Sequence, residues 1–361
     1  MKILFILEYY YPNIGGVEKL FKSLTENLVS QGHSVEVVTT RFEKNLSKTE
    51  TINGVNIRRL KLSNRFTFTF LSIFFMISNV RKCDIIHTTS YNAAFPAWLA
   101  SKIFRKKTVI TFHEVWGPLW RELPYLNKVQ RFLFSSYESF ILKLRFNLYI
   151  AVSDFTSKKL VDAGIPKDKI VKIYNGIDYD QYKTEQGDLA SSFTFTFFGR
   201  LGVSKGLDLI IPTAKQFILK HPQSIFKLII PKTPKAFYNR IIKDIRNLDL
   251  DDHIELMHQL SFDELKEEIS KSHCILIPSY SEGFCFAAVE TSALDVPVIS
   301  SGKGALKETT LGRHIFMDTF NQEGLYNALE RAYKNDFDYF DPKRFNLNSS
   351  IEAYLKMYKK L

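Results

Sequence analysis

The sequence has few cysteines, and they form no pattern. Cys83, Cys274 and Cys285 are odd in number and widely spaced, and no Cys-x-x-Cys pair occurs. This excludes a disulfide framework and a cysteine-based zinc site, so a reducing, cytoplasmic compartment is expected. A signal peptide is not indicated either. Residues 1–8 hold only a short apolar run before a glutamate and predict a first strand instead.

Acidic residues are scarce in one stretch. Residues 51–150 hold 15 Lys and Arg against 4 Asp and Glu, whereas residues 181–361 hold 23 of each. The net charge of +11 therefore belongs to a basic patch in the first half. This patch has three interpretations: a solvated face, a surface for an anionic membrane, or a nucleic-acid site. No nucleic acid is expected, because no helix-turn-helix, zinc-finger or RNA-recognition signature accompanies the charge.

A strongly apolar segment at residues 65–80 is shorter than the roughly 20 residues that cross a bilayer. It is rich in phenylalanine and is followed by Arg81 and Lys82. As a helix, it has two interpretations that the sequence leaves open. Residues 66–77 belong either to a domain core or to a membrane interface, with the basic ends on lipid phosphates.

Two kinds of motif are missing. A dinucleotide-dependent oxidoreductase would carry Gly-x-Gly-x-x-Gly after its first strand and an acid about 20 residues later, which Gly15 and Gly16 do not supply. No His, Cys and carboxylate cluster suggests a metal. Asp-x-Asp pairs do occur, but none follows a clear buried strand, so we expect turns and loops there. These pairs are Asp178/Asp180, Asp249/Asp251 and Asp336/Asp338.

The length and the pattern of apolar segments predict two α/β domains. A chain of 361 residues is too long for one ordinary core. Short buried strands alternate with helices from residue 2 onward, and a second such series begins at residue 193, which is typical of parallel sheets. We expect a first domain at residues 1–180 and a second at residues 181–345. The remaining segment, residues 346–361, holds an amphipathic helix from residue 350 that is expected to dock back on the first domain.

The clearest site pattern lies where a predicted strand at residues 274–278 meets a predicted helix at residues 286–294. The first N–H groups of a helix lack partners and its dipole favours negative charge, so this junction predicts an anion site. Glu282 and Glu290 flank it, and we expect them to hold ligand hydroxyls while the helix start holds phosphates. The spacing Glu-x7-Glu occurs three times, but only this pair lies where a strand, a Gly turn and a helix start meet.

Two cations lie in the first loop of the second half. Arg200 and Lys205 stand beside Gly202 and Gly206, directly after a predicted strand. Two positive charges in such a loop suit a diphosphate, and the alternative is an exposed basic loop.

The first half holds three further candidates. His113 ends a predicted strand, and ligands of parallel sheets sit at the carboxyl ends of strands. Gly15 and Gly16 open a predicted helix and either let the backbone approach a phosphate or only make the loop flexible. Residues 116–120 and 129–145 are aromatic and basic, so they cover an acceptor cleft, touch lipid, or serve as lid and core.

With these residues assembled, the chain resembles glycosyltransferase family 4, retaining enzymes of the GT-B fold with two Rossmann-like domains facing across a cleft. The resemblance spans nearly the whole chain and is carried by residues 11–16, 84–87, 175–178, 199–206, 278–290 and 296–298. It implies transfer of a hexose from a UDP- or GDP-sugar to a glycan or lipid-linked acceptor, in cell-envelope or glycoprotein glycan synthesis. No cofactor or metal is implied, and the basic first domain suggests peripheral contact with an anionic membrane.

The resemblance also implies roles. Arg200 and Lys205 would hold the pyrophosphate, Glu282 the sugar hydroxyls, and His113 would face the transferred sugar. The remaining donor-side residues would be Gly15, Gly16, Gly283, Phe284, Cys285 and, at the ribose, Glu290.

Three positions depart from the family pattern. Cys285 stands where a Gly is usual, residues 230–233 replace a common Gly-x-Gly, and Gln259 replaces another Gly. These changes affect the donor pocket more than the reaction. A non-catalytic membrane- or partner-binding relative is the alternative, and such a protein should have lost a cation or a glutamate that this chain keeps.

Overall fold

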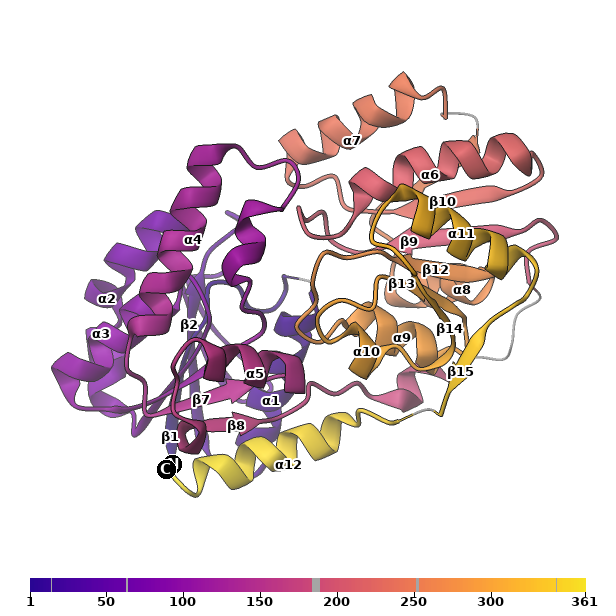
Figure 1. Cartoon of the computed structure of the whole chain (residues 1–361). Coiled ribbons are helices and arrows are strands. Elements are labelled where there is room, and N and C mark those ends of the chain that lie inside the picture. The colour runs from indigo at the N-terminus through magenta and orange to yellow at the C-terminus, as the bar shows by residue number, and fades with distance from the viewer. Residues whose placement is uncertain (14, 63, 184–188, 251–252, 342) are drawn as a thin grey trace. The chain divides into compact units, whose positions relative to one another are not determined.

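The computed structural model describes residues 1–13, 15–62, 64–183, 189–250, 253–341 and 343–361. The chain forms two compact units, each a Rossmann-like α/β unit with a mostly parallel sheet (Figure 1). Unit 1 comprises Met1–Trp120, Val129–Gly176 and Leu347–Leu361, and unit 2 comprises Arg121–Lys128 and Ile177–Asn346.

Unit 1 is built on an eight-stranded sheet of order β3-β4-β2-β1-β5-β6-β7-β8. All its strand pairs are parallel except β3 with β4. Its elements are β1 (Lys2–Ile6), α1 (Gly16–Ser30), β2 (Ser34–Thr40), β3 (Thr49–Ile52), β4 (Val55–Leu60), α2 (Arg65–Lys82), β5 (Ile85–Thr89), α3 (Ala94–Phe104), β6 (Lys107–Phe112), the 3-10 helix Gly117–Arg121, α4 (Lys128–Lys143), β7 (Leu148–Ala151), α5 (Asp154–Asp162), the 3-10 helix Lys167–Lys169, β8 (Ile170–Lys172) and α12 (Leu347–Tyr358).

Both faces of this sheet are covered. Ile3 and Phe5 of β1 point to one face and Leu4 and Ile6 to the other. The first face packs against α1 and α12, and the second against α2, α3, α4 and α5. A central parallel strand is therefore apolar on both sides, which explains why β1 is a continuous apolar run rather than an alternating one.

The last helix, α12, belongs to unit 1 and packs on the face that α1 covers (Figure 1). Its Tyr358 hydroxyl is hydrogen-bonded to Nδ1 of His87 on β5, and Nε2 of His87 lies 2.8 Å from Oγ1 of Thr111. His87 is fully buried. Burial, together with the nearby His113, lowers the pKa of His87 to about 3, so this imidazole is neutral at neutral pH.

Unit 2 has a seven-stranded sheet of order β11-β10-β9-β12-β13-β14-β15, parallel except for β15 against β14. Its main core lies on the face covered by α6, α7 and α11. The elements are the 3-10 helix η3 (Tyr179–Tyr182), β9 (Thr194–Phe198), α6 (Leu207–Lys220), β10 (Ile225–Ile229), α7 (Lys235–Asn247), β11 (Ile254–Met257), α8 (Phe262–Ser270), β12 (Cys274–Ile277), α9 (Phe286–Ala293), β13 (Val298–Ser300), α10 (Leu306–Thr309), β14 (Gly312–Phe316), α11 (Gln322–Tyr333) and β15 (Asp338–Phe340).

The predicted α/β fold is confirmed, and its errors concern short elements. Four strands were not predicted: β3, β8, β14 and β15. The hairpin of β3 and β4 had a sequence signal, the pair Asn53-Gly54, which favours a two-residue turn. In the structure these two residues form that turn, with φ of 47° and 80°. The strand β15 had none, since all three of its residues are exposed and show no alternation. The final helix begins at Leu347, three residues before the expected start.

The segment at residues 65–80 is part of the core on one side only. It forms α2, whose N-terminus is fixed by a capping box between Asn64 and Thr67. One face of the helix, with Phe68 and Met76, is buried in unit 1, and another keeps large apolar side chains in solvent. Among the described residues, no helix combines the length and apolarity needed to span a membrane.

Candidate functional site

In unit 2, the loops that follow β9 and β12 are joined. Gly206 is the N-cap of α6 and has φ of 73°, and a Cβ atom there would lie 2.1 Å from the carbonyl oxygen of Pro278. Only glycine allows this approach, because both the backbone conformation and the contact exclude a side chain. Next to it, the amide of Tyr280 donates to the carbonyl of Ser204 at 2.7 Å. The two loops therefore form one structure at the carboxyl ends of neighbouring parallel strands.

Lys205 and Glu282 meet where these loops join. Nζ of Lys205 lies 2.7 Å from Oε1 of Glu282, and the hydroxyl of Ser279 donates to the same oxygen at 2.7 Å. Glu282 is buried, while Lys205 is partly exposed. Both of these hydrogen bonds are made to Oε1. Oε2 of the same carboxylate is therefore the oxygen suited to accept from a ligand hydroxyl.

A third loop, after β13, supports the backbone of Glu282. The amide of Ala305 donates to the carbonyl of Glu282 at 2.8 Å, and the hydroxyl of Ser301 donates to that of Ser279 at 2.6 Å. Gly304 has φ of 67°, and a Cβ atom there would lie 2.4 Å from the carbonyl oxygen of Glu282. Sequence reasoning missed this loop, although Gly302 and Gly304 directly after the strand of residues 296–300 were a usable signal.

The start of α9 follows the same turn. Gly283 and Phe284 lead into Cys285, which caps the helix with φ of 66°, a conformation that favours glycine. The ring of Phe284 is buried against Phe286 and Phe345. Burial raises the pKa of the Cys285 thiol, and the carboxylate of Glu282 adds to this, so the thiol stays protonated.

Glu290 lies one turn further along α9 and contacts Tyr182. The Tyr182 hydroxyl donates to Oε1 of Glu290 at 2.9 Å, and its ring packs edge-on against Phe262. Burial and the adjacent carboxylate both raise the pKa of Tyr182, so it remains a hydrogen-bond donor. Tyr182 was not predicted, because nothing in the sequence links η3 to a helix more than a hundred residues later.

Arg200 lies on the loop after β9, and its side chain is exposed. The same loop ends at α6, whose first turn carries Asp208. The hydroxyl of Tyr280 donates to Asp208 at 2.7 Å, which ties the two loops together a second time. Arg200, Lys205, Gly283, Phe284, Cys285, Glu282 and Glu290 are thus carried by two joined loops and the helix that follows them.

In unit 1, the predicted residues stand at the carboxyl edge of the parallel sheet. Gly15 is the N-cap of α1 and Gly16 its first residue, after β1. His113 directly follows β6, and its ring packs edge-on against Phe21 of α1, with centroids 6.0 Å apart. The segment that follows His113 is held by Glu138 of α4.

Glu138 is buried and accepts hydrogen bonds from the amides of Trp116 and Gly117 at 2.9 and 2.6 Å. The hydroxyl of Tyr91 donates to it at 2.8 Å. Glu138 therefore fixes the loop that begins at His113. A signal existed, since Glu138 is the one acid of an otherwise basic amphipathic helix.

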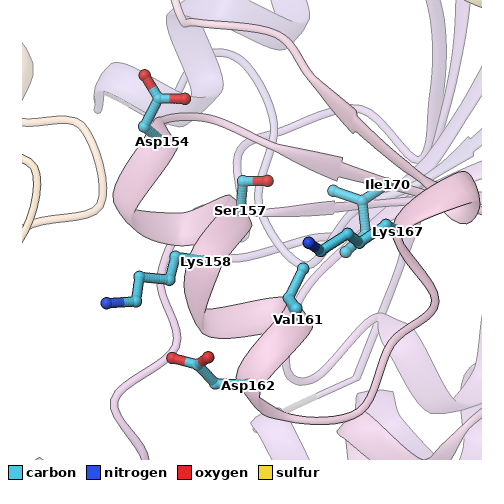
Figure 2. Close-up of a pocket in the computed structure, with 7 residues that line it drawn as sticks. All are labelled: Asp154, Ser157, Lys158, Val161, Asp162, Lys167 and Ile170. Atoms are coloured by element: carbon cyan, nitrogen blue, oxygen red, sulfur yellow. The ribbon is translucent and has the colours of Figure 1, made fainter.

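Unit 1 also has a surface hollow of about 520 Å³ along α5 and β8 (Figure 2). Figure 2 shows charged side chains of both signs around it, among them Asp154, Lys158 and Asp162. None of the predicted site residues lines it. The described residues contain no group of three or more His, Cys, Asp and Glu side chains arranged to hold a metal ion. Asp251, one member of the Asp-x-Asp pairs, lies outside the described residues.

The joined loops of unit 2 carry two cationic side chains and lead into a helix start, and the buried carboxylate of Glu282 contacts one of these cations, Lys205. Positive charge fixed in this way stabilises a negative group without reorganisation. The carboxylate has an oxygen suited to a hydroxyl group. A ligand carrying both phosphate and hydroxyl groups matches this set.

Two family models match the chain, one in each half. The model described as Glycosyltransferase Family 4 matches residues 14–181, and the model described as Glycosyl transferases group 1 matches residues 179–350. Among curated proteins, a subunit of human phosphatidylinositol N-acetylglucosaminyltransferase is 24% identical over 342 residues, which is 91% of this chain and 68% of the relative. A GDP-mannose:cellobiosyl-diphosphopolyprenol alpha-mannosyltransferase from Xanthomonas oryzae is 23% identical over 83% of this chain and 78% of its own length.

Solved structures show the same fold at low identity. Sucrose-phosphate synthase from Thermosynechococcus elongatus superimposes with a TM-score of 0.81 at 17% identity, covering 100% of this chain and 99% of the other. Anabaena HepE in complex with UDP-glucose superimposes with a TM-score of 0.77 at 17% identity and covers 100% of both chains.

Proposed function

Because the chain belongs to glycosyltransferase family 4, we propose that it transfers a hexose from a UDP- or GDP-sugar to a glycan or lipid-linked acceptor with retention of anomeric configuration. The observation that carries this proposal is the contact of Lys205 with Glu282 at two joined loops beside the start of α9. The complex of Anabaena HepE with UDP-glucose supports a sugar-nucleotide donor.

On the donor side, charge decides the roles. Lys205 and Arg200 would neutralise the diphosphate, helped by the amides of Phe284 and Cys285 directly before α9, by Gly283 and by the backbone at Gly15 and Gly16. Glu282 would accept a sugar hydroxyl on Oε2, and Glu290 would accept from the ribose. Departure of the nucleoside diphosphate builds negative charge on the leaving oxygens, so fixed cations lower the barrier.

For the reacting carbon we propose attack on the same face through an oxocarbenium-like state. A double displacement needs a free carboxylate nucleophile. Glu282 is buried, its Oε1 is held by Lys205 and Ser279, and its Oε2 is the oxygen proposed for a sugar hydroxyl, so it is not assigned as the nucleophile. His113 would face the transferred sugar. No metal is assigned a role, so activity should persist in EDTA.

For the acceptor, we propose a glycan or lipid-linked molecule at the cytoplasmic face of a membrane, in cell-envelope or glycoprotein glycan synthesis. The names of two relatives support this, since one acts on phosphatidylinositol and the other on a diphosphopolyprenol. The basic first half would bring the enzyme to an anionic lipid surface as a peripheral protein.

The decisive experiment is a thermal-shift screen against UDP- and GDP-sugars, followed by donor hydrolysis with the wild type, Lys205→Ala and Lys271→Ala. Lys271 is a matched control, because it is a lysine of unit 2 of similar side-chain exposure, 38% against 32%, paired with glutamates of α8, the helix that it caps. Lys205→Ala should lower turnover by about 100- to 1000-fold, while Lys271→Ala should retain it.

Unchanged turnover in Lys205→Ala would contradict the assignment. The alternative function, a non-catalytic membrane- or partner-binding relative, predicts no donor hydrolysis in any variant. Loss of activity in EDTA that is restored by a divalent cation would contradict metal independence.

A further inference from the structure

One face of α2 leaves its large apolar side chains in solvent. Phe68, Ile73 and Met76 are buried in unit 1, but another set on the same helix is 43–72% exposed. This set, which we call the α2 stripe, consists of Phe66, Phe70, Leu71, Phe74 and Phe75. Four aromatic rings in solvent on one helix are not needed for the fold, because the opposite face already fills the core.

The stripe is continuous along the helix. Phe66, Phe70 and Phe74 are spaced four residues apart, and Leu71 and Phe75 lie beside them, so all five side chains share one side of α2. The helix has 18 residues and is therefore about 27 Å long. It lies along the surface of unit 1, since its other side is packed on the sheet.

The stripe also continues sideways. Phe70 contacts Phe95 of α3, and Phe95 contacts Phe140 of α4, with ring centroids 5.9 and 5.6 Å apart. Of the eighteen exposed large hydrophobic side chains among the described residues, eleven lie on these three helices: five on α2, one on α3 and five on α4. The apolar surface is therefore concentrated on one part of unit 1, and such patches mark interaction sites.

The exposed charges carried by these three helices are of one sign. The helices α2 and α3 contain no acidic residue, and the single acid of α4, Glu138, is buried. Basic side chains stand at both ends of α2, with Arg65 at its start and Arg81 and Lys82 at its end. Arg65 pairs with Glu8 at 2.9 Å, yet its side chain remains 66% exposed.

We propose that the α2 stripe is a membrane-docking surface that lies flat in the interface of an anionic bilayer. Apolar rings would enter the boundary between headgroups and acyl chains, while Arg65, Arg81 and Lys82 contact lipid phosphates. The buried opposite face excludes insertion across the bilayer. A second copy of the chain fits the surface less well, because two basic surfaces repel each other. This inference deepens the proposed function, because it names the surface that would bring the enzyme to the membrane. It rests on the proposed function only for the biological role of docking, and not for the docking itself.

The test uses sedimentation with vesicles of phosphatidylglycerol and phosphatidylcholine in equal parts, and with pure phosphatidylcholine. The wild type should bind the anionic vesicles, and added salt should weaken binding because charges are screened. The double variant Phe70→Ser/Phe74→Ser should bind about 10- to 100-fold more weakly. Leu219→Ser is the control, since Leu219 in unit 2 is 69% exposed, as is Phe74, and it should bind like the wild type.

A second pair of variants does not depend on removing apolar surface. The emission that Phe74→Trp adds to that of the three native tryptophans should shift to the blue when anionic vesicles are added, and the emission that Leu219→Trp adds should not. The proposal would be overturned if Phe70→Ser/Phe74→Ser bound anionic vesicles as tightly as the wild type, or if the emission of Phe74→Trp showed no blue shift. A dimeric wild type that becomes monomeric in the double variant would assign the stripe to self-association instead.

Donor hydrolysis in detergent-free buffer separates this inference from the proposed function. The double variant should keep the wild-type rate of hydrolysis, because the stripe carries no donor residue. Vesicle binding without hydrolysis would defeat the proposed function and leave the docking surface standing. Hydrolysis without vesicle binding would support the proposed donor chemistry and contradict the docking surface.

Discussion

The two units share one architecture but begin the helices at their predicted sites differently. In unit 2, α6 and α9 follow residues with positive φ, Gly206 at 73° and Cys285 at 66°. In unit 1, α1 follows Gly15 at φ of −177°, an extended conformation open to any residue, and its first residue Gly16 is helical. The glycine of unit 2 is therefore required by its own fold, whereas Gly15 and Gly16 are not required by backbone conformation.

The units also differ in where their chemistry lies. Unit 2 places cations and a buried carboxylate on joined loops, held by close backbone contacts. Unit 1 concentrates positive charge and exposed apolar side chains on helices. A shared α/β fold thus supports two kinds of surface, because loops and outer helix faces vary while the sheet core stays the same.

The largest expected effect comes from Gly206→Ala. The new methyl group would meet the carbonyl of Pro278 and would also impose left-handed strain, so we expect unit 2 to lose about 3–5 kcal/mol of unfolding free energy. Gly164→Ala in unit 1 is the matched control, because Gly164 has φ of 85° with nothing within 4 Å of the added atom. It should lose only about 1–2 kcal/mol.

Calorimetry combined with tryptophan fluorescence distinguishes these two effects. All three tryptophans, Trp98, Trp116 and Trp120, lie in unit 1. The destabilisation caused by Gly164→Ala should therefore be seen in the unfolding transition followed by fluorescence. The destabilisation caused by Gly206→Ala should be seen by calorimetry alone. Equal losses for the two variants would show that the contact with Pro278 is not tight.

The next effect is a pH dependence of unit 1. His87 has a pKa of about 3 in the folded state and about 6.5 when unfolded, so below pH 6.5 the unfolded chain binds a proton that the folded chain does not. The contribution of His87 to the free energy of unfolding is therefore fully present above pH 6.5. As the pH falls from 6.5 to about 3, the free energy of unfolding decreases by about 1.4 kcal/mol per pH unit.

Urea unfolding followed by tryptophan fluorescence measures this dependence in unit 1. His87→Gln should be less stable at pH 7, because it loses the imidazole contacts to Tyr358 and Thr111, but it should show a shallower slope between pH 6 and pH 4. Identical slopes in the two proteins would exclude His87 as the titrating group.

A smaller effect is expected for Gly16→Ala. Alanine is favoured over glycine in a helix by about 1 kcal/mol, so unit 1 should keep or gain stability. If the backbone at Gly16 approaches the donor phosphates, the KM for the donor should rise about tenfold while kcat changes little. Wild-type KM in a stable variant would assign Gly16 to loop flexibility alone.

The smallest effect is expected for Cys285→Gly. Glycine removes the strain of positive φ but also removes a buried thiol, and the two changes nearly cancel, so stability should stay within about 1 kcal/mol. Calorimetry measures the stability of the variant, and donor hydrolysis shows whether the site still functions. A large loss of stability would mean that the Cys285 side chain is needed to hold the start of α9.

Prediction from sequence succeeded where a pattern is dense and local. The strands β1 and β12 were predicted because a strand buried on both faces is a continuous apolar run. The Glu282 turn was predicted because a strand, a glycine and a helix start follow one another within a dozen residues. The exposed strand β15 carried no such pattern and was missed.

The sequence by itself determined the α/β class, the basic first half and the junction that carries Glu282, because all three are properties of composition or of neighbouring residues. Only the tertiary structure decided that Lys205 meets Glu282, that Gly304 and Tyr182 support this site, and that α2 is buried on one side and exposed on the other. These facts depend on contacts between segments distant in the chain, which packing selects and local propensity does not encode.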